Sequence, residues 1–191
     1  MAKLRYLVLH CSDTPPSMTV TKAILEQWHK GPCDLDAGQV KYLGKIYPSR
    51  AALPKQQQGG VDILKLHGRG WDRLGYYAII HRDGTKEILT PNNLDDEITS
   101  DEITWGVAGI NSQAIHIVLE GGKGPLINFD YHFTAEQDIE LFAFCKLMIL
   151  HHPDILIIGH NQKAAKTCPG FKVYEWLMDH SIEKWGTRRR L

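Results

Sequence analysis

Net charge is the first feature that this sequence lacks. Lysine and arginine together number 22, aspartate and glutamate also number 22, and the formal net charge at pH 7 is therefore zero. Dedicated nucleic-acid binders usually carry excess positive charge, because their lysine and arginine side chains replace the counterions around the phosphates. The sequence consequently predicts no nucleic-acid partner.

Long apolar runs are also missing. One of the longest apolar stretches, residues 141–150, is far shorter than the roughly 20 apolar residues of a transmembrane helix. Near the N-terminus, the run from Tyr6 to Leu9 is shorter than the apolar core of about 7 to 15 residues in a secretory signal. We therefore expect no membrane insertion and no signal peptide, so that the chain is cytoplasmic when made.

Cysteine is scarce as well. The four cysteines stand at positions 11, 33, 145 and 168, and none forms a Cys-x-x-Cys pair. Four cysteines in 191 residues are too few for a disulfide-stabilised scaffold, so a reducing compartment is the simpler interpretation. Any zinc site in this chain would also have to recruit histidine.

The sequence has the composition of one globular domain. Hydrophobic residues make up 43% of the chain and charged residues 23%, and no internal repeat is visible. A length of 191 residues suits one domain with a sizeable core. We predict a single domain over residues 1–191 and expect a monomer.

Hydrophobic periodicity divides most of the chain into strands and helices. Short apolar runs predict strands near residues 6–10, 76–80, 87–89, 114–120 and 155–158. Asp83-Gly84 predicts a tight hairpin turn with positive φ angles. Helical spacing predicts helices over 20–30, 134–152 and 171–184. The second helix starts with a capping box of Thr134 and Gln137. The predicted fold class is α/β, because strands and helices are mixed.

The pattern breaks up between residues 31 and 69, where prolines, glycines and a run of glutamines interrupt it. We predict a long irregular insertion after the first helix, with one short helix at most. Long loops are often functional, and this one could cover a binding groove or bind a partner. The sequence fits equally well with a surface loop that has no function and does little harm to stability.

Three residues are candidate metal ligands. His10 ends the first predicted strand, His160 follows the last one, and Cys168 lies eight residues further on in a loop. Zinc binds imidazole nitrogen and thiolate sulfur, and catalytic zinc sites combine three protein ligands with one open position. This spacing alone fits ordinary, partly buried side chains as well.

Five blocks of residues follow one another in an order that is hard to obtain by chance. They are Tyr6-Leu7-Val8-Leu9-His10-Cys11-Ser12-Asp13-Thr14; Gln27-Trp28-His29-Lys30; Gly70-Trp71-Asp72-Arg73-Leu74-Gly75-Tyr76-Tyr77-Ala78-Ile79-Ile80 with Arg82-Asp83-Gly84-Thr85; Gly109, Asn111, Ser112, Ile115 and Gly121-Gly122; and Gly159-His160, Lys166-Thr167-Cys168-Pro169 and Phe171. These blocks resemble the zinc-dependent N-acetylmuramoyl-L-alanine amidases of type 2 and the peptidoglycan recognition proteins (PGRPs). The similarity is greatest to the short phage lysozyme branch of this family.

The resemblance implies a central mixed β-sheet flanked by helices, with Zn²⁺ bound in a groove by His10, His160 and Cys168. Its implied substrate is peptidoglycan or a muropeptide, cut between N-acetylmuramic acid and L-alanine. The implied role is that of a phage or prophage endolysin, which acts on the cell wall after release. Tyr76 would orient the attacking water, and Lys166 would stabilise the developing oxyanion. Considered alone, Tyr76 could equally be a strand tyrosine that packs against the sheet. Lys166 considered alone could equally be a solvent-exposed loop lysine.

The chain departs from the family pattern at Trp105, where many relatives carry a groove histidine. Trp105 and the nearby Asn111 are candidate substrate-binding residues, although a tryptophan packed on the hairpin fits Trp105 equally. Val118 stands where some cytosolic members have a catalytic glutamate. Glu120 we interpret as a strand-end carboxylate that faces water or a loop amide. Compact relatives also lack most of the 31–69 insertion.

Three other functions remain open. The chain could be a cytosolic amidase that recycles wall fragments, or a non-catalytic module that binds peptidoglycan. Members that bind without cleaving commonly lack the cysteine ligand, so the presence of Cys168 favours catalysis. A metal-free hydrolase using Cys168 or Cys11 with a histidine is the third alternative. It predicts a reactive thiolate and activity that survives chelation.

Overall fold

The computed structural model describes residues 1–58 and 60–182, which form two compact units. Unit 1 combines residues 1–19 with the described part of 76–191, and unit 2 comprises residues 20–75. The predicted 31–69 insertion lies wholly inside unit 2. Its status as an insertion into a single domain stays a prediction. The predicted end of the last helix at Lys184 lies outside the described residues.

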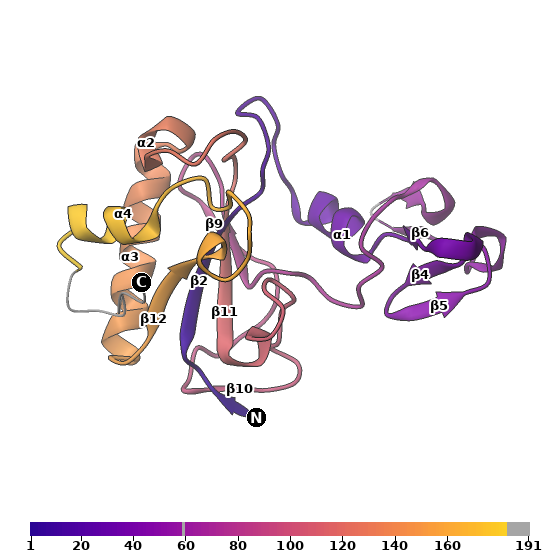
Figure 1. The fold of residues 1–191 in the computed structure, drawn as a ribbon, viewed down its shortest axis with the longest axis horizontal. Helices are drawn as coiled ribbons and strands as arrows, with labels where there is room; N and C mark the ends of the chain where they lie inside the picture. Colours follow the sequence, from indigo (N-terminus) through magenta and orange to yellow (C-terminus); the bar gives the residue numbers. More distant parts are fainter. Residues whose placement is uncertain (59, 183–191) are drawn as a thin grey trace. The chain divides into compact units, whose positions relative to one another are not determined.

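Unit 1 is built on a five-stranded sheet with the strand order β12-β2-β11-β8-β9 (Figure 1). Its strands are β2 (Tyr6–Cys11), β8 (Ala78–Ile80), β9 (Lys86–Ile88), β11 (Ala114–Leu119) and β12 (Leu156–Gly159). Neighbouring strands run parallel except β9, which is antiparallel to β8. The predicted mixed sheet and its five strands are confirmed.

The hairpin between β8 and β9 is confirmed, but its turn differs from the prediction. The backbone N–H of His81 donates to the carbonyl of Thr85 at 2.9 Å, which closes a loop of three residues. Only Gly84 in this loop has a positive φ, of 82°, whereas Asp83 does not. A three-residue hairpin loop needs the left-handed conformation at one position, whereas a two-residue turn of the Asp-Gly type needs it at both.

Three helices lie on one face of this sheet: α2 (Phe129–His132), α3 (Ala135–His151) and α4 (Val173–Asp179) (Figure 1). The capping box of Thr134 and Gln137 is confirmed at the start of α3. The last helix begins later than predicted, because Phe171 forms a β-bridge with Ile127 instead. No helix among the described residues is long and apolar enough to span a membrane.

The alternation of side chains in β2 and β11 separates the main core from the opposite face. Leu7 and Leu9 of β2 pack, with Ile117 of β11, into the large cluster that contains α3 and α4. Side chains of the intervening positions point to the other face, because successive residues of a strand alternate. That second face carries Val8 and His10 of β2.

Unit 2 begins with α1 (Lys22–Lys30), the predicted first helix, which Thr21 caps through its side-chain oxygen. The rest contains the short strands β3 (Cys33–Asp34), β4 (Val40–Tyr42), β5 (Lys45–Tyr47), β6 (Gln57–Gln58) and β7 (Val61–Asp62). The insertion that we predicted to be irregular therefore contains short strands, and strands of two or three residues are too short to show a period. Its helical turns are 3₁₀ turns such as Arg50–Ala52.

A last pairing joins β1 (Ala2–Lys3) to β10 (Glu97–Ile98) in an antiparallel ladder. These two-residue strands were not predictable from periodicity. All four cysteines are free.

Candidate metal centre

Parallel strand ends bring the three predicted ligands together. In the sheet register His10 of β2 lies opposite Val118 of β11, and Gly159 of β12 lies opposite Leu9. His160 therefore follows β12 directly beside the end of β2. The loop that follows His160 returns to the start of the loop, where the backbone N–H of Asn161 donates to the carbonyl of Cys168 at 2.8 Å.

The close return of this loop requires a glycine at the end of β12. A Cβ atom on Gly159 would lie 2.5 Å from the side-chain oxygen of Asn161 and 2.9 Å from Pro169. Both distances are shorter than van der Waals contact. The glycine before His160 therefore lets the segment with Cys168 pack against the strand end.

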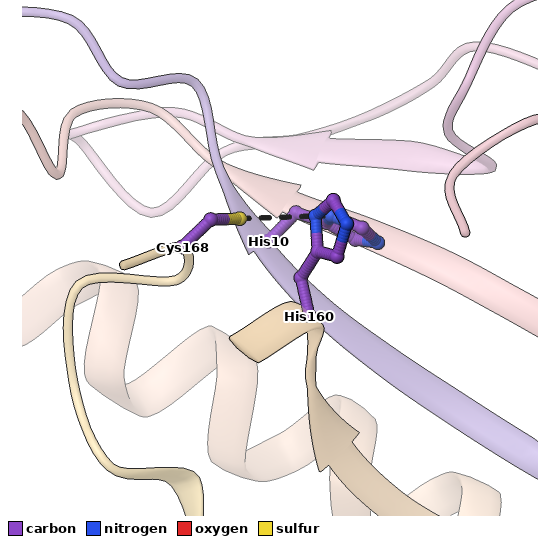
Figure 2. Close-up of side chains that lie close together, drawn as sticks. All are labelled: His10, His160 and Cys168. Carbon is purple, nitrogen blue, oxygen red and sulfur yellow. Dashed lines mark hydrogen bonds between the residues drawn. The ribbon is translucent and has the colours of Figure 1, made fainter. Parts of the chain in front are cut away.

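The three side chains form one cluster, in which they point toward one another (Figure 2). One donor atom from each of His10, His160 and Cys168 lies within 4.8 Å of the others. The Cys168 Sγ atom is 3.7 Å from Nδ1 of His10. The centroids of the His10 and His160 imidazole rings are 4.8 Å apart. Tetrahedral zinc with ordinary Zn–N and Zn–S bonds places nitrogen and sulfur ligands about 3.5 Å apart. The cluster can therefore hold a metal ion with little rearrangement.

The Cys168 thiol is embedded in local hydrogen bonds. Its sulfur accepts the backbone N–H of Cys11 at 3.4 Å. A hydrogen bond with the Cys11 side chain, together with burial, raises the pKa of the Cys168 thiol well above its usual range. The charge of Lys166 acts in the opposite direction. Coordination to a divalent cation would instead favour the Cys168 thiolate, because a thiol that binds a metal is deprotonated.

A third histidine, which the sequence did not single out, lies beside the cluster. His116 of β11 is completely buried, and its Nδ1 atom is 3.0 Å from Nε2 of His10. Burial, with a smaller contribution from His160, lowers the pKa of His116 to about 3, so its imidazole is neutral near pH 7. Strand alternation indicates its face, but only the strand order shows that this face adjoins His10.

The structure places Tyr76 near the cluster and Lys166 on the loop that leads to Cys168. The ring of Tyr76 is half-buried, and its centroid is 5.1 Å from that of His10. Lys166 is exposed. Their predicted roles toward water and oxyanion stay predictions.

The two candidate substrate-binding residues differ in their surroundings. Trp105 is half-buried. The side-chain oxygen of Asn111 accepts the backbone N–H of Val107 at 2.8 Å, so this oxygen stabilises the loop. Contact of either residue with substrate stays a prediction.

Glu120 binds a loop amide, as interpreted from the sequence, but it does not face open water. It is 4% exposed, and its carboxylate accepts the backbone N–H of Arg82 at 3.2 Å. The same oxygen lies 3.2 Å from Nδ1 of His81. This carboxylate borders a cleft of about 370 Å³ between the β8–β9 hairpin and the loop of Pro16 to Thr19.

The chain is similar to several known proteins in sequence or in fold. No protein-family model matches the chain. The chain is 26% identical to the endolysin of Escherichia phage T7 over 172 residues, which are 89% of this chain and 83% of that protein. Its fold is similar to the N-acetylmuramoyl-L-alanine amidase LysC from Clostridium intestinale URNW, with a TM-score of 0.57, 18% identity, and coverage of 94% of this chain and 87% of the other. The bumblebee PGRP-SA has the same fold at a TM-score of 0.54, 16% identity, and coverage of 94% and 83%.

Proposed function

We propose that this chain, a member of the type 2 amidase and PGRP family, cuts peptidoglycan at the amide bond between N-acetylmuramic acid and L-alanine. The observation that carries this proposal is the cluster of His10, His160 and Cys168 at the strand ends of this fold. Similarity to a phage endolysin over 89% of the chain supports a lytic role. Such an enzyme is made in the cytoplasm and acts on the wall after release.

Zn²⁺ is the cofactor that fits these residues. Two imidazoles and one thiol form a mixed nitrogen and sulfur donor set, which is typical of zinc and unsuited to the oxygen-seeking Mg²⁺ and Ca²⁺. Bound by His10, His160 and Cys168, zinc would supply an acidic water and polarise the amide carbonyl.

Tyr76 and Lys166 would complete the chemistry. The phenol of Tyr76 would hold the attacking water by a hydrogen bond, and the 5.1 Å between the ring centroids of Tyr76 and His10 supports this role. The exposed ammonium group of Lys166 precedes Cys168 by two residues and would stabilise negative charge on the carbonyl oxygen. Trp105 would stack on the substrate, and the amide N–H₂ group of Asn111 would donate a hydrogen bond to it.

Metal analysis combined with a cleavage assay tests this function. Zinc is quantified in the purified protein, and free peptide stems are measured after incubation with peptidoglycan, with and without a chelator. We expect one zinc per chain, and loss of stem release on chelation and in Cys168→Ala. Cys33→Ala is the matched control, because Cys33 lies in unit 2 and outside the cluster. Zinc binding without cleavage would identify a non-catalytic recognition module.

A thiol hydrolase is the second candidate, because Cys168 Sγ lies 3.7 Å from Nδ1 of His10. The raised pKa of Cys168 opposes it, since the thiolate is the nucleophile. Stem release that survives chelation but not Cys168→Ala would establish this alternative and reject the zinc site.

The substrate form separates a lytic enzyme from a recycling one. We expect stem release from intact sacculi as well as from soluble muropeptides. Cleavage restricted to soluble muropeptides would identify a cytosolic recycling amidase. We further expect a monomer, which sedimentation of the zinc-loaded protein checks.

A further inference from the structure

The buried face of β11 contains a histidine that packing does not explain. His116 is completely buried, and β11 lies beside β2 with His116 opposite Val8. A polar ring inside a sheet costs free energy unless its nitrogens form hydrogen bonds. An apolar side chain would fill this position better, so the imidazole requires a specific reason.

The polar contact of His116 is with a ligand of the candidate metal centre. Its Nδ1 atom lies 3.0 Å from Nε2 of His10, whereas its own Nε2 atom has no hydrogen-bond partner among the described residues. The other ring nitrogen of His10, Nδ1, lies 3.7 Å from the sulfur of Cys168. His10 therefore directs one nitrogen to the cluster and the other to His116.

The backbone holds the His116 ring in this position. A Cβ atom on Gly106 would lie 2.3 Å from Nδ1 of His116 and 2.5 Å from Cγ of the same ring. The loop therefore passes directly over the imidazole, and only glycine allows it to come so close. The hydrogen bond to His10 consequently has a fixed geometry.

The proton in this hydrogen bond determines whether His10 can bind a metal. Two neutral imidazole nitrogens form a hydrogen bond only if one carries the proton. If Nε2 of His10 donates, its Nδ1 atom keeps a free lone pair toward the cluster. If His116 donates instead, Nδ1 of His10 is protonated and cannot bind a metal.

We propose that His116 is a positioning residue that orients the His10 ring and holds it in the tautomer with the proton on Nε2, so that Nδ1 binds the metal. This inference rests on the proposed zinc site. The partner on the far nitrogen of a ligating histidine fixes the ring and its tautomer, and its loss typically lowers metal affinity about 10- to 100-fold.

Zinc affinity of His116 variants tests the inference, measured by competition with a chromophoric chelator. We expect His116→Phe to lower zinc affinity about 10- to 100-fold, because the apolar ring cannot accept from His10. His116→Asn should retain most of the affinity, since its side-chain oxygen can accept near the position of Nδ1. His152→Phe is the matched control for loss of a buried histidine, because His152 bonds to Asp96 and Leu94 and does not contact the cluster.

Thermal unfolding of the metal-free variants distinguishes positioning from structural support. His116→Phe should be as stable as the wild type or more so, because it removes a buried nitrogen without a partner. Lower stability with unchanged zinc affinity would show that His116 is merely structural and would overturn the proposal.

A measurement on the wild-type chain keeps the test valid if His116→Phe does not fold. Nitrogen-15 NMR of the histidine rings in the zinc-loaded protein should show His10 protonated on Nε2 and bound through Nδ1. Binding through Nε2, or a proton on Nδ1, would overturn the inference.

All three readouts, zinc affinity, thermal unfolding and histidine NMR, are independent of hydrolysis. If zinc binds with the expected order of affinities but no peptidoglycan is cut, the proposed function fails and this inference stands. If the wild-type chain binds no zinc, both fail.

Discussion

The two units of this protein are stabilised in different ways. Unit 1 has a five-stranded sheet, and its strands β2, β8, β11 and β12 contribute to one large apolar cluster with α3 and α4. The corresponding cluster of unit 2 consists of Val40, Tyr42, Leu53 and Ile63, with Tyr47 packed against it. Long strands bury enough apolar surface to define a fold, whereas the short strands of unit 2 require additional polar contacts.

Arg50 supplies such contacts in unit 2. Its guanidinium group donates to both carboxylate oxygens of Asp34, at 2.7 and 2.9 Å. It also donates to the carbonyl oxygens of Leu64 and Leu66, both at 3.0 Å. The planar group therefore connects three segments that have no common strand ladder. The comparison shows that unit 1, with its regular strands, is the more predictable from sequence. Unit 1 also contains the candidate metal centre.

Removal of a histidine should affect stem release very differently in the two units, and this is the largest effect that we expect. We expect His160→Ala to lower stem release by roughly 10³-fold or more, because it removes one of three zinc ligands. His67→Ala, an exposed histidine of unit 2, should retain full activity. Equal losses in both variants would show that the chemistry is not confined to unit 1.

Core truncation compares the two apolar clusters directly. Ile117 in β11 and Ile63 in unit 2 are both completely buried. Substitution by alanine should lower the free energy of unfolding by about 4 kcal/mol at position 117 and by about 2 kcal/mol at position 63, where a small cluster relaxes more easily. Urea denaturation measures both, and a larger loss at Ile63 would contradict the comparison.

Acid should destabilise unit 2 through His29. Burial is the main cause that lowers the pKa of this histidine from 6.5 to about 4. The unfolded chain therefore binds a proton below about pH 6.5, while the folded chain does so only near pH 4. Stability should fall as the pH drops through this window, by up to about 3 kcal/mol.

His29→Asn should flatten this part of the pH profile, because asparagine does not titrate but can still accept the backbone N–H of Gly75. The measurement is the free energy of unfolding of both proteins between pH 7 and pH 4. Parallel profiles for variant and wild type would exclude His29 as the cause.

The proposed roles of Tyr76 and Lys166 predict smaller losses than removal of a ligand. Tyr76→Phe and Lys166→Met should each lower kcat about 10²-fold while zinc content stays unchanged, because neither side chain is a ligand. Lys45→Met in unit 2 controls for the loss of an exposed lysine. Wild-type kcat in either variant would remove that residue from the mechanism.

Arg50→Lys should have the smallest effect. Lysine keeps the positive charge but cannot donate to Asp34 and two carbonyl groups at once. We expect a loss of about 1 to 2 kcal/mol in the free energy of unfolding, with unchanged stem release. A loss of activity would indicate that the conformation of unit 2 affects hydrolysis.

Much of unit 1 was predictable because local patterns determine it. The capping box at Thr134 and Gln137 predicted the start of α3, and apolar alternation predicted β11. Beyond α1, unit 2 was not predictable, since the contacts of Arg50 join residues that are 14 to 16 positions away along the chain. No local period indicates such contacts.

The sequence by itself determined the residue types of the metal centre and their order along the chain. His10 and His160 were identifiable because they stand in recognisable blocks at strand ends, and Cys168 because it stands in the loop block that follows His160. Only the tertiary structure decided that His116 is the partner of His10, although 106 positions separate them. The physical reason is that strand neighbours are chosen by packing of the whole sheet, whereas hydrophobic periodicity reports only the face of each single strand.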